Sequence, residues 1–283
     1  MNTMKIAVVT DSTSYIPQEV IDKLNIHVIP LSVNFGEETY AENIEISTDK
    51  FYEKLQEEKA LPTTSQPAIG AFIELYEKLE QSYDAVISIH ISKKLSGTFE
   101  TAKSAGNMME KLQVHAYDTE YSAMPQGFYV IRAAELANEG QDIASIIQAL
   151  NELRKNIRAY FMVDDLSHLQ RGGRLSGAQA LLGSLLNIKP ILHIVEGSIV
   201  PYEKVRTKKR ALRRIVKMLE DDVQTKRVQR VVFIHGNNEK EALKLRDDFQ
   251  AKYPNIETMI SYFGPVVGTH LGEGSLGITW YKQ

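Results

Sequence analysis

Four short segments rich in hydroxyl side chains stand where helices are expected to begin. They are Asp11-Ser12-Thr13-Ser14, Thr63-Thr64-Ser65-Gln66, Leu95-Ser96-Gly97-Thr98 and Asp118-Thr119-Glu120-Tyr121-Ser122. Each one alone is a typical N-cap, because Ser, Thr and Asp side chains accept hydrogen bonds from the free N–H groups of a helix start. Together they predict more, since the turns that follow parallel strands all lie at one edge of a sheet. Such an edge would bind a small anionic group, a carboxylate or a phosphate, through neutral donors and helix amino termini.

Short β-branched runs alternate with amphipathic helical patterns along the chain, which indicates an α/β fold with parallel pairing through crossover helices. A helix over 67–81 is one example. Glu196-Gly197 between two strand patterns predicts a hairpin, so the second half should contain antiparallel pairs as well. The expected strands are Lys5–Thr10, His27–Asn34, Asp84–Ile91, Val114–Asp118, Arg158–Val163, Ile188–Val195, Ser198–Val205, Arg230–His235, Ile256–Tyr262 and Leu276–Trp280.

The length of 283 residues predicts one large or two modest domains, and we place the boundary after residue 155, giving domains 1–155 and 156–283. The composition is that of a globular chain, with 43% hydrophobic and 24% charged residues. A formal net charge of −3 does not favour a nucleic-acid partner. The chain has no cysteine, which excludes disulfides and thiolate metal sites.

The amino terminus has only a four-residue apolar run, Ile6 to Val9, and no small-residue cleavage site of a secretory signal. No window approaches the 18 or so uninterrupted apolar residues of a transmembrane helix. We therefore expect a cytoplasmic protein without an integral membrane segment.

Several familiar catalytic patterns do not fit. Gly272-Glu273-Gly274-Ser275-Leu276-Gly277 matches G-x-G-x-x-G but lies six residues from the end, leaving no room for the helix that a dinucleotide needs. The seven histidines contain no i, i+4 pair of the zinc-protease kind, and G-x-S-x-G is absent. Asp164-Asp165 after a strand would suit Mg²⁺, but a helix cap by Asp165 is the favoured interpretation. We expect no metal and no cofactor.

Six motifs appear in order along the chain: Asp11-Ser12-Thr13, Thr64-Ser65-Gln66-Pro67, Ile91-Ser92-Lys93-Lys94-Leu95-Ser96-Gly97-Thr98, Gly172-Gly173-Arg174, Leu186-Asn187-Ile188-Lys189-Pro190-Ile191-Leu192 and Gly264-Pro265-Val266-Val267-Gly268-Thr269-His270. With these motifs the sequence resembles the DegV family over essentially its full length. One departure is visible at Glu273, where relatives often have proline between two glycines.

The resemblance implies a two-domain α/β fold of the EDD type, with a largely parallel sheet in the N-terminal domain and a mixed sheet in the C-terminal domain. It implies one long-chain fatty acid bound between the domains, and no reaction by this chain itself. A separate ATP-dependent fatty-acid kinase subunit would phosphorylate the bound carboxylate, and the acyl phosphate would enter phospholipid synthesis. The implied carboxylate-binding residues are Thr64, Ser96, Gly97 and His270, supported by Thr63, Ser65, Thr98, Asp11 and Ser12.

Burial of the acyl chain would supply most of the affinity. Each methylene contributes about 0.8 kcal/mol, so roughly 14 of them give on the order of 11 kcal/mol before ordering costs. This requires a long apolar tunnel, which a helix over Ala178–Leu186 would line.

The segment from Lys204 to Lys217 holds eight positive side chains and no acid. On one continuous helix, Arg206, Arg210, Arg213 and Lys217 would share a face. The face is either simply solvated or a docking surface. With Arg171 and Arg174, which the family fold brings near, we favour docking of an acidic kinase partner or its phosphate.

Two alternatives remain open from the sequence. One is a phosphotransfer enzyme related to dihydroxyacetone kinase that uses His270, and the other is a binder of a different apolar anion.

Overall fold

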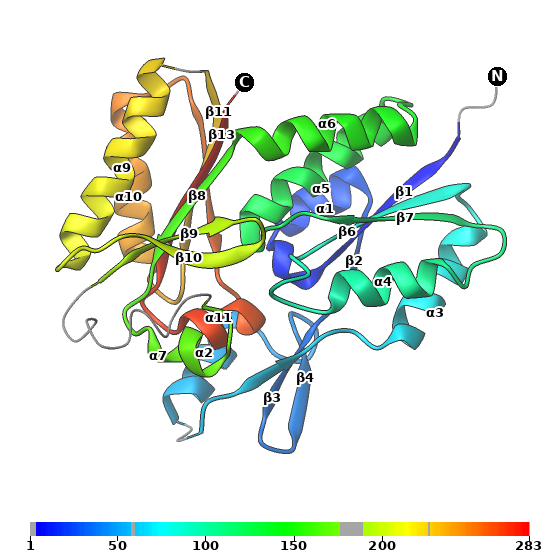
Figure 1. The fold of residues 1–283 in the computed structure, drawn as a ribbon, viewed down its shortest axis with the longest axis horizontal. Coiled ribbons are helices and arrows are strands. Elements are labelled where there is room, and N and C mark those ends of the chain that lie inside the picture. Colours follow the sequence, from blue (N-terminus) through cyan, green and yellow to red (C-terminus); the bar gives the residue numbers. More distant parts are fainter. Residues whose placement is uncertain (1–3, 58–59, 176–188, 226, 283) are drawn as a thin grey trace.

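The computed structural model describes residues 4–57, 60–175, 189–225 and 227–282. The first of two large sheets is entirely parallel (Figure 1). Its strands, in spatial order, are β2 (Ile26–Ile29), β1 (Ile6–Asp11), β6 (Ala85–His90) and β7 (Gln113–Asp118). All six residues of β6 are buried, as expected of a central parallel strand with both faces covered.

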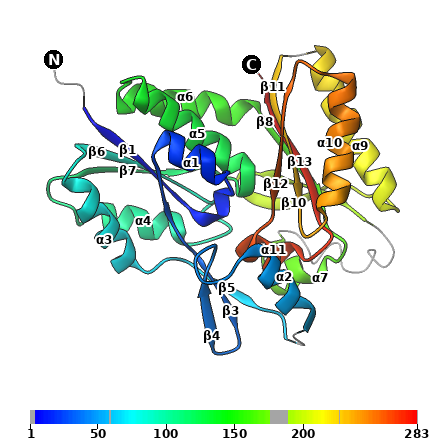
Figure 2. The ribbon, with the colours of Figure 1, turned by 180° about the vertical axis from the view of Figure 1, so that it is seen from behind.

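Helices cover both faces of this sheet. α3 (Ile69–Glu80) and α4 (Thr98–Gly106) pack on one face. α1 (Gln18–Leu24), α5 (Ala123–Asn138) and α6 (Ile143–Asn156) lie on the other (Figure 2). α5 and α6 also contact the second sheet, so these two helices are sandwiched between the sheets.

The second sheet has six strands and is mixed. Its order is β10 (Ser198–Glu203), β9 (Ile191–Val195), β8 (Ile157–Met162), β13 (Leu276–Lys282), β11 (Val228–His235) and β12 (Glu257–Tyr262). β11 and β12 pair in parallel and the other neighbours are antiparallel. α9 (Lys208–Thr225) and α10 (Glu239–Lys252) cover its outer face. The predicted α/β class, with one parallel and one mixed sheet, is confirmed.

The hairpin predicted at Glu196-Gly197 joins β9 and β10. Both turn residues have positive φ, 47° and 82°, as tight hairpin turns require. The chain passes from α6 into β8 at residues 156 and 157. The boundary after residue 155 stays a prediction.

A smaller three-stranded sheet lies at one end of the molecule, in the order β4 (Glu38–Ala41), β3 (Ser32–Phe35) and β5 (Thr63–Ser65). Three helices gather beside it: α2 (Thr48–Glu57), α7 (Ser167–Arg171) and α11 (Pro265–Leu271). The short 3-10 helix η1 (Ser12–Ser14) follows β1.

This sheet corrects two predictions. The single strand His27–Asn34 is wrong, because the segment forms β2 and β3 in different sheets. Pro30 lies between them and has no N–H to donate to a ladder. Thr63-Thr64-Ser65 is not a helix start either. It forms β5, and α3 begins only at Ile69.

No helix in the four described ranges is long and apolar enough to cross a membrane. The helix predicted over Ala178–Leu186 lies outside the described residues.

Candidate functional site

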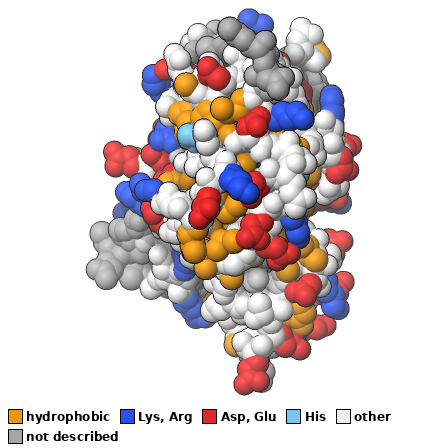
Figure 3. All heavy atoms as spheres, turned by 90° about the vertical axis from the view of Figure 1, so that its right-hand side faces the viewer, with side chains coloured by type: hydrophobic (Ala, Val, Ile, Leu, Met, Phe, Trp, Pro, Cys, Tyr) orange, Lys and Arg blue, Asp and Glu red, His pale blue; other side chains and the backbone are white. Residues whose placement is uncertain are grey.

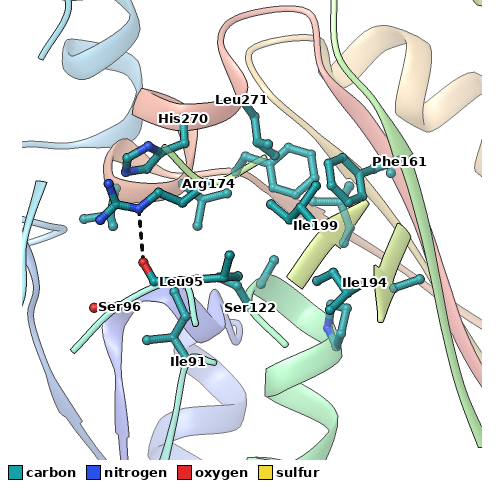
Figure 4. A pocket seen from close by; sticks show the side chains of 18 of the residues that line it. Ile91, Leu95, Ser96, Ser122, Phe161, Arg174, Ile194, Ile199, His270 and Leu271 are labelled. Atoms are coloured by element: carbon teal, nitrogen blue, oxygen red, sulfur yellow. Dashed lines mark hydrogen bonds between the residues drawn. The ribbon is translucent and has the colours of Figure 1, made fainter. Parts of the chain in front are cut away.

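A cavity of ≈ 160 Å³ lies between the two halves of the chain. This volume is below the range of about 300–1,000 Å³ that is common for small-molecule sites. Much of its wall is apolar, including Ile91 and Leu95 from the first half and Phe161, Ile194 and Ile199 from the second (Figure 4). Both domains are therefore needed to enclose it.

Polar side chains are concentrated at one end of the cavity. Ser96, Arg174 and His270 lie together on one side of Figure 4, with Phe161 and Ile194 on the other. This arrangement suits an amphiphile with one polar end, because the polar groups fix its orientation and the apolar wall buries the remainder.

Thr64 and His270 meet at the polar end. Thr64 comes from β5 and His270 from α11, and Thr64 Oγ1 lies 3.0 Å from Nε2 of His270. Burial, together with the nearby Arg174 and His168, lowers the pKa of His270 to about 4. The imidazole is therefore neutral at pH 7. Its Nδ1 is buried without a hydrogen-bond partner among the described residues.

Gly172 makes room for this imidazole. A Cβ at Gly172 would lie 2.3 Å from Nδ1 of His270, so a larger residue would have to displace the ring. Gly172 therefore helps to place His270 against Thr64.

Ser96 and Gly97 stand at the start of α4. Ser96 Oγ lies 2.9 Å from the hydroxyl of Thr98 and accepts a weak hydrogen bond from its N–H at 3.3 Å. Gly97 occupies the N-cap position, where the helix dipole favours an anion. A Cβ there would meet the side chain of Gln66 at 2.0 Å, so the cavity wall is closely packed at this point.

Arg174 lines the polar end of the cavity, although the sequence predicted only neutral donors there. Its Nε donates to the carbonyl of Leu95 at 3.2 Å, and Nη1 donates to the carbonyl of Gly172. A fixed positive charge is thus present beside the hydroxyls. Sequence reasoning placed Arg174 only on a docking surface, although the motif Gly172-Gly173-Arg174 was a signal for the site.

The predicted supporting residues lie in different surroundings. Ser65 lines the cavity, and Thr98 is hydrogen-bonded to Ser96. Thr63 lines a second cavity, which adjoins the first at Thr64, Arg174 and His270 and also contains Arg171. Asp11 and Ser12 are buried and do not line the cavity.

Asp11 holds a strand end near the site without lining the cavity. Its carboxylate accepts hydrogen bonds from His90 at 2.9 Å and from the N–H of Ile91 at 3.0 Å. These contacts fix the end of β6, from which the chain continues to Ser96. Gln66 also lines the cavity and was not singled out from the sequence, although it belongs to the motif Thr64-Ser65-Gln66-Pro67.

The basic segment differs from its prediction. α9 begins at Lys208, so Arg206 precedes the helix and cannot share a helical face with Arg210, Arg213 and Lys217. Arg206 is exposed. Other positive charges of the segment have acidic partners: Lys208 lies 3.0 Å from Glu241, Arg214 lies 2.8 Å from Glu203, and Lys217 lies 2.7 Å from Asp221.

Lys208 Nζ also lies 3.7 Å from Asp164, which precedes α7. This ion pair connects the start of α9 to the segment before α7, the helix that ends at Arg171. Asp165 accepts a hydrogen bond from the N–H of Ser167 at 2.8 Å, but the N-cap residue of α7 is Leu166, one position later than predicted. The part of the chain that the structure describes contains no group of three potential metal ligands. On the side of the molecule that lies away from α9, acidic and basic side chains are interspersed (Figure 3).

Comparisons with known proteins agree with this architecture. The family model "Uncharacterised protein, DegV family" matches residues 5–283. Protein DegV of Bacillus subtilis is 54% identical over 278 residues, covering 98% of this chain and 99% of the relative.

Two solved structures are closely similar. The crystal structure of DegV from Bacillus subtilis, described as a fatty acid binding protein, has a TM-score of 0.94 and 53% identity, covering 99% of this chain and 100% of the other. A DegV family protein from Thermus thermophilus, described in terms of fatty acid binding, has a TM-score of 0.91 and 35% identity, again covering 99% and 100%.

Proposed function

This chain belongs to the DegV family, and on that premise we propose that it binds one long-chain fatty acid in the cavity between its domains. The observation that carries the proposal is the cavity itself, apolar along most of its wall and polar at one end. An acyl chain of about 16 carbons would be stabilised by roughly 0.8 kcal/mol per buried methylene, less the cost of ordering.

The carboxylate occupies the polar end in this proposal. A carboxylate is ionised at pH 7 and needs strong donors when it is buried. Thr64, Ser96 and the N–H of Gly97 supply donors, and Arg174 supplies a positive charge. His270 is neutral, because the pKa of its ring is lowered to about 4, and it orients the Thr64 hydroxyl through their 3.0 Å contact.

We further propose that the protein is a carrier in the cytoplasm, without catalytic residues of its own. A separate ATP-dependent kinase would phosphorylate the bound carboxylate, and the acyl phosphate would be used in phospholipid synthesis. Arg171, Arg174 and Arg206 are the proposed docking residues. Arg171 and Arg174 line the cavity that adjoins the polar end, and Arg206 precedes the helix tied to the same region through Lys208.

Organic extraction of the recombinant protein followed by mass spectrometry tests the ligand. We expect one long-chain fatty acid per chain. A sterol-like or retinoid-like acid would instead favour the binder of another apolar anion, and no lipid after incubation with palmitate would contradict the proposal. The phosphotransfer alternative with His270 predicts ATP turnover by the purified protein alone, whereas a carrier predicts none without its kinase.

Charge reversal tests the docking role. Arg206→Glu should slow phosphorylation by the kinase about tenfold, because charged surface groups mainly change association rates. Fatty-acid affinity should stay within twofold of wild type. Lys23→Glu, at an exposed position of α1, is the matched control and should leave both unchanged. Equal loss of binding and phosphorylation in Arg206→Glu would reject the docking role.

A further inference from the structure

Glu42 is a buried carboxyl group at the junction of β4, the turn after β1, and α11. Only 1% of its surface is exposed. Its Oε1 accepts hydrogen bonds from the Tyr15 hydroxyl and from the N–H of Val266, each at 2.8 Å, and its Oε2 accepts one from the Ser12 hydroxyl. Glu42 does not line the cavity, so it would not touch a ligand there.

α11 has no N-terminal cap from its own side chains. The N-cap residue is Gly264, and Pro265 has no N–H. The N–H of Val266 is satisfied by Glu42, and the N–H of Val267 donates to the Tyr15 hydroxyl at 3.1 Å. The free N–H groups of a helix start must find acceptors, and here residues of the N-terminal domain provide them.

The start of α11 packs closely against Tyr15 and Glu42. A Cβ at Gly264 would lie 2.5 Å from the Tyr15 ring and 3.1 Å from Oε1 of Glu42. The short link between β12 and α11 is held by the same domain, because the Tyr52 hydroxyl donates to the carbonyl of Phe263 at 2.8 Å. The start of α11 is thus held from the N-terminal domain by several side chains.

α11 forms part of the cavity wall. Val266, Val267, His270 and Leu271 all line the cavity, and His270 contacts Thr64. We propose that Glu42 is a positioning residue: with Tyr15 it caps α11 across the domain boundary and so fixes His270 and the adjoining wall for ligand binding. The effect on binding rests on the proposed fatty-acid function, whereas the effect on the position of His270 does not.

The ionised carboxylate is the form matched to this role, because the three groups that contact Glu42 are all donors. Burial raises its pKa to about 7, although hydrogen bonds from Ser12, Val266 and Tyr15 oppose the rise. Among the titratable groups that face it, burial raises the pKa of Tyr15, Tyr52 and Tyr262 further above their ordinary range. Burial also tends to raise the pKa of Asp11, but contacts with His90 outweigh it and leave that pKa lowered. Of these groups, Glu42 is the one expected to titrate between pH 6 and 8.

The test compares Glu42→Gln with Glu45→Gln, an exposed acid of the same loop whose carboxylate accepts only from the N–H of Ala41 in the described contacts. Palmitate affinity is measured between pH 6 and 8.5, and the ring resonances of His270 are followed by NMR. Wild type and Glu45→Gln should bind several-fold more weakly at pH 6 than at pH 8. At pH 8, Glu42→Gln should bind palmitate about tenfold more weakly than wild type, as expected for a lost helix cap. Its affinity should not change between pH 6 and pH 8.

The His270 resonance should move in ligand-free Glu42→Gln and remain in place in Glu45→Gln. If Glu42→Gln does not fold, Tyr15→Phe removes the acceptor of the Val267 N–H and should move the same resonance. The proposal would be overturned if Glu42→Gln had the same palmitate affinity, pH profile and His270 resonance as wild type. Failure of wild type to bind palmitate, with the His270 resonance still displaced in the variant, would refute the fatty-acid function and leave the positioning role standing.

Discussion

At the scale of single residues, the polar end of the cavity depends on contacts between side chains that are distant in sequence. Thr64 and His270 are 206 positions apart and meet at 3.0 Å. Because His270 is neutral at pH 7, the fixed positive charge at this end comes from Arg174. In the proposed function, hydroxyl donors and one guanidinium would together hold the carboxylate.

Replacement of Thr64 tests the hydroxyl. Thr64→Val should weaken palmitate binding at least tenfold, because a hydrogen bond to a charged group contributes about 1.5–3 kcal/mol. Thr39→Val is the control, since Thr39 is exposed on β4 of the same small sheet and lines neither cavity. Titration calorimetry measures both. Similar affinities for the two variants would exclude Thr64 from the headgroup site.

Gly172 offers a steric test of His270. Gly172→Ala places a methyl group 2.3 Å from the position of Nδ1, so the ring must move away from Thr64. We expect weaker palmitate binding and a displaced His270 resonance. The control is Gly70→Ala in α3, where nothing lies within 4 Å of the new Cβ. An unmoved resonance in Gly172→Ala would show that the ring is not confined there.

At the scale of elements, short pieces at one end of the molecule carry the polar groups, while the large sheets and their helices supply the frame. β5 brings Thr64, the start of α4 brings Ser96, and α11 brings His270. α11 depends on Glu42 for its cap, and this buried acid has a cost for folding.

The pH dependence of stability follows from the raised pKa of Glu42. Its pKa of about 7 in the folded protein exceeds the ordinary 4.5, so protonation favours the folded state. This contribution is complete below about pH 4.5 and is lost as pH rises through 7. Relative to Glu42→Gln, wild type should lose up to about 3 kcal/mol of unfolding free energy between pH 5 and pH 8. Urea unfolding at several pH values measures the difference. If the unfolding free energies of the two proteins changed with pH in the same way, the raised pKa of Glu42 would be contradicted.

At the scale of the whole molecule, the cavity is walled by both halves of the chain. The β9–β10 hairpin crosses to the first half, where the hydroxyl of Ser92 donates to the carbonyl of Gly197 at 2.8 Å. A ligand in the cavity would therefore contact both halves at once and oppose their separation.

Removal of the ligand tests this coupling. A ligand at 100 times its Kd stabilises the folded state by about 2.7 kcal/mol. For a chain of this size, delipidation should then lower Tm by about 5–10 °C, and added palmitate should restore it. Calorimetry measures Tm, and hydrogen exchange should show protection by palmitate in both β6 and β8. Protection confined to one half would contradict a shared site.

The amino-acid sequence determined much of the local structure: most strands with their β-branched runs, the amphipathic helices and the hairpin at Glu196-Gly197. These features rest on periodicity and turn chemistry within a few neighbouring residues. Tertiary structure decided which segments meet. Packing of the sheets and helices placed β5 beside α11, brought Arg174 into the cavity, and buried Glu42 under a helix more than 200 residues away. Such contacts depend on how the sheets and helices pack in three dimensions, which no local pattern records.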